Sequence, residues 1–238
     1  MTLSDLELLE VQIDALWTHD ADGRIRQSNE PDGDPAPRFF FARTREGNRW
    51  RFRYDVPAEI VSQLEHLAAS EPVISDLRAQ PVNFEAFYDV LRPHEEVQDT
   101  SSGPSYQFPA DIARPANAVA ITEANADLLS GLIPDEDAIH VPRSLTVRIP
   151  WIVVVEQGTG VASCFSARLT AQVAEAGLWT HDAFRGRGYG SAATAAWACA
   201  VRDMGRIPFY TTDWSNLASQ GVARKLGLRM YASGVGLS

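Results

Sequence analysis

Cysteine is scarce in this chain of 238 residues, which contains only Cys164 and Cys199. A metal knuckle needs cysteines or histidines a few residues apart, and neither cysteine has such a companion. The five histidines show no metal-ligand spacing either, so we expect no metal. Both cysteines lie in apolar segments, and we expect them to be small buried hydrophobic residues.

Long apolar runs are also lacking. No segment approaches the length of a membrane span, and the first residues are acidic where a secretion signal would be basic. We therefore expect a cytoplasmic protein that makes no use of a membrane.

Basic residues are the minority, with 21 Lys and Arg against 31 Asp and Glu, a formal net charge of -10 and a pI of about 4.9. A protein of this charge has no long-range attraction for nucleic acid or anionic lipid, so neither is expected as a partner. A cationic amine or a basic peptide is a more natural ligand.

Glycine, in contrast, is concentrated in one hexapeptide, between an apolar stretch at 174–180 and an Ala-rich one at 191–204. The hexapeptide is Arg185, Gly186, Arg187, Gly188, Tyr189 and Gly190. This order predicts a strand, a tight loop and a helix. Such a loop exposes backbone N–H groups next to the positive end of a helix dipole, which favours a pyrophosphate or similar anion. A flexible glycine turn with solvated arginines is the alternative.

Three phosphate-binding patterns can be compared with this loop. The Walker pattern fails because no Gly-Lys-Ser/Thr follows. The dinucleotide pattern G-x-G-x-x-A fits residues 188–193, and Asp213 follows at a suitable distance. However, residues 214–238 are too few to complete a doubly wound sheet, so an NAD-type site remains the weaker alternative.

The third pattern, R/Q-x-x-G-x-G/A, is satisfied by Arg185, Gly188 and Gly190. This loop resembles the acetyl-CoA loop of the GNAT acyltransferase superfamily. Residues 216–228 look like that superfamily's N-x-x-A/S-x-x-x-x-x-K-x-G-F/L helix, and residues 174–179 are similar to its A-E-x-G-Y-W strand. Two motifs at the expected spacing make the resemblance specific.

The resemblance implies an α/β (α+β) fold with a mixed, mostly antiparallel sheet and a V-shaped splay between its fourth and fifth strands. A run rich in Ser, Pro and Gly at 98–117 is the best candidate for a domain boundary. We therefore expect an N-terminal accessory α/β region at 1–110 and a GNAT-like acetyltransferase domain at 111–238.

Local patterns predict the individual elements. In the first region we expect a helix that starts at a Ser4 capping box, a hairpin at Asp22-Gly23, a second hairpin around Glu46-Gly47-Asn48, and a helix at 57–69. In the second region we expect strands at 118–121, 152–155, 161–168, 171–180 and 207–211, and helices at 123–130, 135–141, 191–204 and 216–226.

Arginines make residues 38–53 locally basic. A solvated sheet face is the simplest interpretation. The alternative is that Arg51 and Arg53 contact the phosphates of coenzyme A or another anion.

The resemblance also assigns roles to site residues. It places backbone N–H groups at Trp179, Thr180 and His181 against the pantetheine and the thioester carbonyl, and the pyrophosphate on the hexapeptide. It places Asn216 beside the pantetheine, with Ser219 as a further cofactor contact.

Glu175 is the candidate general base, because it is an acidic side chain on an otherwise apolar strand that leads to the cofactor. We expect a water between it and the amine. A structural carboxylate is an equally good interpretation of Glu175. His181 is a candidate proton relay or a solvent-facing loop residue.

One departure from the superfamily concerns the leaving thiolate. The Tyr that many members use as general acid aligns with Ala223, which leaves Tyr189, Tyr210 and Ser219 as candidates. The resemblance implies an N-acetyltransferase that moves an acetyl group from acetyl-CoA to a primary amine of a small molecule or peptide by direct attack. A catalytically silent acyl-CoA sensor is the alternative, and a homodimer stays open.

Overall fold

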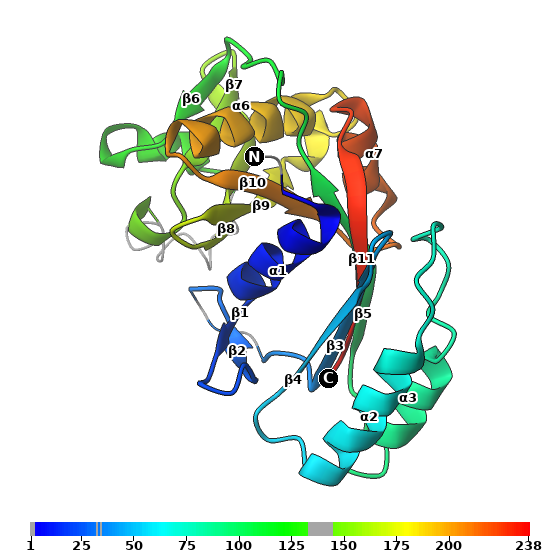
Figure 1. Ribbon diagram of the computed structural model, residues 1–238. Helices are drawn as coiled ribbons and strands as arrows, with labels where there is room; N and C mark the ends of the chain where they lie inside the picture. The colour runs from blue at the N-terminus through cyan, green and yellow to red at the C-terminus, as the bar shows by residue number, and fades with distance from the viewer. Residues whose placement is uncertain (1–2, 32, 34, 133–144) are drawn as a thin grey trace. The chain divides into compact units, whose positions relative to one another are not determined.

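The computed structural model describes residues 3–31, 33, 35–132 and 145–238 (Figure 1). The chain forms two compact units and passes between them more than once. Unit 1 comprises Met1–Tyr106, Thr211–Asn216 and Met230–Ser238, and unit 2 comprises Gln107–Tyr210 and Leu217–Arg229. Each unit has a hydrophobic core of its own.

Unit 1 opens with helix α1 (Asp5–Leu16), which begins at the predicted capping box. The Ser4 hydroxyl accepts from the Glu7 N–H at 3.2 Å, and the Glu7 carboxylate accepts from the Ser4 N–H at 2.8 Å. Strands β1 (Trp17–His19) and β2 (Ile25–Ser28) then form an antiparallel hairpin. The predicted change from helix to hairpin is confirmed.

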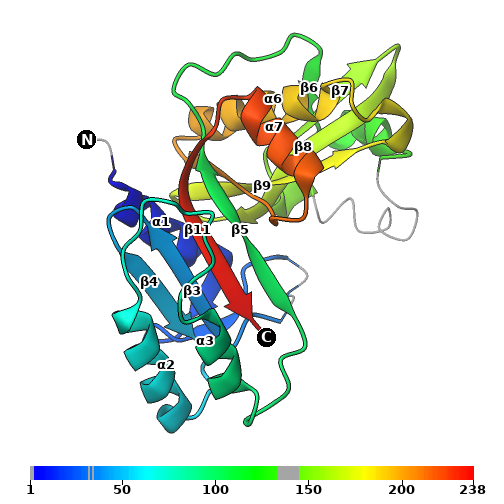
Figure 2. The same ribbon diagram turned by 90° about the vertical axis from the view of Figure 1, so that its right-hand side faces the viewer.

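The main sheet of unit 1 has the strand order β4 (Asn48–Phe52), β3 (Phe39–Thr44), β11 (Arg229–Leu237) and β5 (Thr100–Gln107) (Figure 2). The β3–β4 hairpin was predicted, but β5 and β11 were not. Their glycines hide the strand pattern because they are needed for close packing. A Cβ at Gly234 would lie 2.9 Å from the Phe40 ring, and a Cβ at Gly103 would lie 1.8 Å from the Thr212 carbonyl oxygen.

Helices α2 (Ala58–Ser70) and α3 (Phe84–Leu91) pack on one face of this sheet (Figure 1). The face presents Phe39 and Phe41, and the Phe39 ring meets the Phe87 ring edge-on at 5.0 Å. Aromatic side chains of this size bury much apolar area each, so they dominate the stability of the unit 1 core. Helix α2 confirms the prediction at 57–69, whereas α3 was not predicted.

The arginines of residues 38–53 are not a solvated face throughout. Arg38 and Arg43 are only 1% and 3% exposed, and Arg38 donates hydrogen bonds to the Leu91 and Glu96 carbonyls. The prediction of solvation is wrong for these two, because both are buried and donate hydrogen bonds to backbone carbonyls of distant segments, Arg43 to the Ala79 carbonyl.

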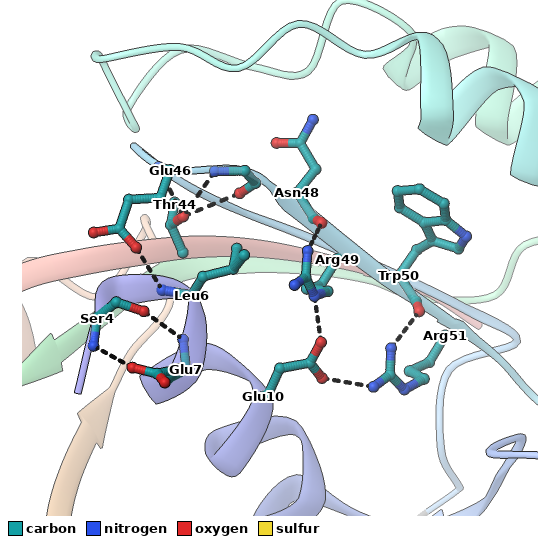
Figure 3. A network of polar contacts seen from close by, with 11 residues as sticks. Ser4, Leu6, Glu7, Glu10, Thr44, Glu46, Asn48, Arg49, Trp50 and Arg51 are labelled. Carbon is teal, nitrogen blue, oxygen red and sulfur yellow. Dashed lines mark hydrogen bonds and ion pairs between the residues drawn. The ribbon is translucent and has the colours of Figure 1, made fainter.

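Glu10 of α1 lies between two further arginines of this stretch (Figure 3). Its carboxylate accepts hydrogen bonds from Arg49 and, at 2.7 Å, from Arg51. Arg53 is paired with Asp55 at 2.7 Å. The two Glu10 ion pairs join α1 to β4, whereas the Arg53–Asp55 pair is local. Contact of Arg51 or Arg53 with a ligand phosphate stays a prediction.

Unit 2 has the strand order β10 (Ile207–Thr211), β9 (Val173–Thr180), β8 (Thr159–Leu169), β7 (Trp151–Glu156) and β6 (Ala118–Ala120). Strands β6 to β9 pair antiparallel, and β10 pairs parallel with β9. The predicted strands are confirmed, and the helix predicted at 123–130 is the 3₁₀ helix η1 (Glu123–Leu129). The helix predicted at 135–141 lies outside the described residues.

Helix α6 (Tyr189–Asp203) packs closely on the unit 2 sheet because most of its buried side chains are small (Ala, Ser and Thr). The one large side chain among them, Trp197, is fully buried and donates from Nε1 to the Ser166 hydroxyl at 3.3 Å. Cys164 is fully buried, and burial raises the pKa of its thiol well above the ordinary value. Cys164 is therefore an inert core residue, as predicted, whereas Cys199 is only half-buried.

Replacement of Gly160 by a residue with a Cβ is expected to destabilise unit 2 strongly. A Cβ at this residue would lie 2.0 Å from the Leu128 carbonyl oxygen and 3.0 Å from Val153. We expect Gly160→Ala to lower the free energy of unfolding by about 3 kcal/mol, because the backbone must move. Gly221→Ala is the matched control, because Gly221 lies inside helix α7 (Leu217–Lys225) with only Arg224 near the position of a Cβ. Alanine favours the helix over glycine, so this variant should raise the free energy of unfolding by roughly 0.5–1 kcal/mol. Chemical denaturation measures both, and equal effects would contradict the close contact.

Candidate functional site

The glycine-rich loop has the predicted local order. Strand β9 ends at Thr180, the short helix η2 (Asp182–Phe184) follows, and α6 begins at Tyr189 with Gly188 as its N-cap. Gly186 and Gly188 have φ angles of 77° and 90°. These left-handed conformations strain any residue with a Cβ, which explains two of the glycines.

Unpaired amides line this loop. Within the described chain, the backbone N–H groups of residues 186–191 donate no hydrogen bond to another protein group. The first N–H groups of any α-helix lack a partner inside the helix. The first turn of α6 carries no acidic residue that could neutralise the helix dipole. The loop and helix start therefore form a site for an anion.

Lys225, the last residue of α7, adds a cation that was not predicted for the site. Its Nζ lies against the loop, only 2.3 Å from where a Cβ at Gly188 would stand. Among the described residues no carboxylate forms an ion pair with Lys225. The sequence motif at 216–228 contains this lysine. However, the spacing of residues in a motif does not show that the lysine side chain reaches the loop at 185–190.

The two loop arginines are exposed. Arg185 pairs with Asp182 at 2.7 Å and donates from Nε to the Thr180 carbonyl at 3.3 Å. The Arg187 guanidinium lies 5.3 Å above the Phe184 ring. Both arginines therefore stay beside the amide-lined loop and add positive charge there.

The end of β9 contacts the start of α6. A Cβ at Gly190 would lie 3.0 Å from the Thr180 hydroxyl, so a larger residue here would need the helix or the Thr180 side chain to shift by a few tenths of an ångström. Trp179 is 43% exposed. The structure thus brings Thr180 and the hexapeptide together. His181 accepts on Nδ1 from the Ala183 N–H at 3.2 Å, which makes it the cap of η2.

Glu175 is 1% exposed in the middle of β9. It lies opposite Arg168 of β8, and opposite Phe209 in the last residue pair between β9 and β10. Strand β9 continues from Glu175 to Thr180 without further pairs to β10. Glu175 therefore marks the point at which the parallel ladder stops.

Tyr210 and Ser219 form a hydroxyl pair, with 2.7 Å between the Tyr210 phenol oxygen and the Ser219 Oγ. Tyr210 is 2% exposed, and Ala223, one turn further along α7, is 1% exposed. Ala223 is thus a packed core residue in this chain. The pairing of Tyr210 with Ser219 could not be predicted, because it joins a strand to a helix.

The remaining predicted residues are Tyr189 and Asn216. Burial raises the pKa of Tyr189, and a hydrogen bond to Glu156 raises it further. The phenol is therefore protonated near neutral pH. Asn216 is exposed directly before α7, in the segment Thr211–Asn216 of unit 1, and donates from its N–H to the Asp213 carbonyl at 3.2 Å. Its contact with a ligand stays a prediction.

Two further features concern only the described part of the chain. It contains no group of three or more His, Cys, Asp or Glu side chains that could hold a metal ion. None of its helices has both the length and the apolar character needed to cross a bilayer.

Comparison with known proteins identifies the family. The model of the acetyltransferase (GNAT) domain matches residues 84–229, more than half of the chain. The protein therefore belongs to the GNAT acetyltransferase family, and the predicted resemblance is confirmed. Comparison with curated proteins gives no match.

Comparison with solved structures gives several similar chains, one of them with a TM-score above 0.5. A GNAT-family acetyltransferase from Colwellia psychrerythraea has a TM-score of 0.51 at 13% identity, over 79% of this chain and 75% of that one. A GCN5-related N-acetyltransferase-like protein from Streptococcus suis 89/1591 has a TM-score of 0.49 at 15% identity, over 85% of each chain. A GNAT-family protein from Novosphingobium aromaticivorans aligns over 60% of this chain and 66% of that one, at 17% identity and a TM-score of 0.44. The mixed α/β fold with a mostly antiparallel sheet is confirmed.

Proposed function

We propose that this protein is an N-acetyltransferase that transfers the acetyl group of acetyl-CoA to a primary amine of a small molecule or peptide by direct attack. One observation carries the proposal: the free N–H groups of residues 186–191 and the Lys225 ammonium converge on one loop. Coenzyme A carries a diphosphate that needs such donors and charge. The residues present therefore fit the cofactor that the family typically uses.

The pantetheine arm would run along β9 beyond Glu175. Residues 176–180 have no pairs to β10, and N–H groups on a strand point alternately to its two sides. The His181 N–H donates to the Val161 carbonyl of β8 at 3.1 Å, so it is not open to the pantetheine as predicted. The alternation then turns the Trp179 N–H toward β8 and the Thr180 N–H away from it, so the Thr180 N–H would hydrogen-bond the arm. This end of the ladder supports a splay between the fourth and fifth strands, which we propose as the entry of the acyl chain.

Acetyl-CoA would supply a thioester carbonyl that is open to attack by an amine. The chain's own groups then move protons. Glu175 would take a proton from the attacking amine through a water, the C–N bond would form and the C–S bond would break. A position at the last β9–β10 pair supports this role for Glu175, because the side chain lies where the two strands stop pairing.

Ser219, held by Tyr210, is the donor that we propose for the leaving thiolate. The position used by many family members carries Ala223 here, which is packed in the core and has no acidic proton. A Ser219 hydroxyl that is hydrogen-bonded to a phenol can pass its proton on and be reprotonated by Tyr210. The phenol of Tyr189 is the second candidate.

Ser219→Ala tests the donor. We expect kcat to fall about tenfold, with an unchanged KM for acetyl-CoA, because the loss acts on the leaving group and not on cofactor binding. Steady-state release of the CoA thiol measures the effect. Ser75→Ala, an exposed serine in unit 1, is the control. An unchanged kcat in Ser219→Ala would exclude this role.

A catalytically silent acyl-CoA-binding module is the second candidate, and the buried Ala223 favours it. The two differ in turnover. Acetyl-CoA binding together with thiol release on at least one member of an amine panel supports the enzyme, whereas binding without release on any amine supports the module. An NAD-type site would be supported if NAD, and not acetyl-CoA, raised the Tm.

A further inference from the structure

Unit 1 contains a cavity of about 240 Å³ that the acetyl-transfer proposal does not use. Its walls come from β3 and β11, from the segment that precedes α3, and from Trp214. It lies at the end of the aromatic core that α2 and α3 cover, because Phe41, Phe84 and Val235 belong to both.

Strand register explains why the wall of the cavity is polar at one end. In the antiparallel pair β3–β11, Phe41 is opposite Val235 and Arg43 is opposite Ser233. Residues two apart on a strand share a face, so these four side chains lie on the same face of the sheet. The apolar core therefore ends at a polar pair that lines the cavity.

Both members of this pair are buried with a donor that has no acceptor in the described chain. Arg43 is 3% exposed; its Nη2 donates to the Ala79 carbonyl, but its Nη1 has no hydrogen-bond partner. Ser233 is 5% exposed, and its hydroxyl has no partner either. Both residues line the same cavity, so one acceptor from a ligand that entered it would satisfy both donors.

The charge around Arg43 limits what the acceptor can be. Glu71 is fully buried, with its carboxylate 3.9 Å from Arg43 Nη1. That carboxylate already accepts hydrogen bonds from the Val82 and Asn83 N–H groups at 2.6 and 3.0 Å. A ligand anion bound to Arg43 Nη1 would lie close to the Glu71 carboxylate, and a doubly charged phosphate would be repelled by it more strongly than a singly charged carboxylate. The singly charged carboxylate still gains a charge-assisted hydrogen bond from Arg43.

The other walls favour a flat, apolar body. Phe84 and Trp214 line the cavity, and the Arg78 guanidinium lies 5.6 Å above the Trp214 ring. Aromatic walls stack on planar groups. The volume is below the roughly 300–1,000 Å³ of pockets for drug-sized ligands, so the ligand is compact.

We propose that this cavity binds a compact aromatic monocarboxylate, with the carboxylate on Arg43 and Ser233 and the ring against Trp214 and Phe84. The site lies in unit 1 alone. Its occupancy can therefore be measured without acetyl-CoA, and failure of either proposal leaves the other standing.

Calorimetric titration of the full chain with benzoate tests the proposed site. We expect benzoate to bind, and benzamide and inorganic phosphate to bind at least about tenfold more weakly. Benzamide lacks the negative charge, and phosphate carries more negative charge than the site accepts. The proposal is overturned if benzoate shows no binding up to ~10 mM. It is also overturned if benzamide or phosphate matches benzoate.

A pair of serine variants separates binding from folding. Ser28 of β2 is also buried, at 4% exposed, with an unpaired hydroxyl, but it does not line the cavity. Neither Ser233→Ala nor Ser28→Ala removes a hydrogen bond, so both should fold with an unchanged Tm. Only Ser233→Ala should weaken benzoate binding, by about tenfold. Equal benzoate affinity in the two variants contradicts the assignment.

Discussion

Replacement of Glu175 by Gln is expected to lower kcat by about 10²- to 10⁴-fold, the usual contribution of a general base. Glutamine has the shape of glutamate but cannot take a proton from the amine. Because the amine must then arrive already deprotonated, part of the lost rate should return as the pH is raised. Thiol release from acetyl-CoA, with an amine chosen from a panel and followed across pH, measures the effect.

The structural alternative for Glu175 predicts a different outcome. A carboxylate that only supports the strand would change the Tm and leave kcat and its pH profile in place. Glu123→Gln, at an exposed glutamate of η1, controls for the loss of one negative charge. An unchanged affinity for acetyl-CoA in Glu175→Gln is expected in either case, since the diphosphate contacts lie elsewhere.

Replacement of Lys225 by Met should weaken acetyl-CoA binding by about 10- to 100-fold. Methionine keeps an unbranched side chain, but the ammonium that lies against Gly188 is lost. A hydrogen bond to a charged group is worth about 1.5–3 kcal/mol, which is the source of this range. Calorimetric titration with acetyl-CoA gives the affinity directly.

Arg224→Met is the matched control for that variant. Arg224 is the neighbouring cation on α7 and is also exposed, and its guanidinium lies near Gly221, 3.8 Å from where a Cβ there would stand. General attraction between cations and the polyanionic cofactor would make the two variants alike. Equal losses of affinity would therefore contradict a specific contact by Lys225.

Local signals in the sequence were sufficient to predict the glycine-rich loop and the strand and helix on either side of it. The glycines at 186 and 188 and the Ala-rich helix that follows predict a strand, a loop and a helix, because each residue acts within a few positions of itself. The Ser4 capping box was predictable for the same reason.

Features that depend on distant parts of the chain could not be predicted. Strands β5 and β11 contain glycines because another segment lies against them, and in the sequence those glycines resemble breakers. Arg38 and Arg43 look like solvated residues until the carbonyls that receive their hydrogen bonds are known. The approach of Lys225 to Gly188 and the Tyr210–Ser219 pair likewise exist only in the folded chain.

An NMR titration of the ¹⁵N-labelled protein with coenzyme A tests the central claim most directly. The account predicts that the largest amide shifts, on saturation, fall on residues 186–191, whose N–H groups would pass from solvent to a diphosphate. Pantetheine, which lacks the diphosphate, should leave these amides in place. Saturation with coenzyme A that moves other amides and not these would contradict the account.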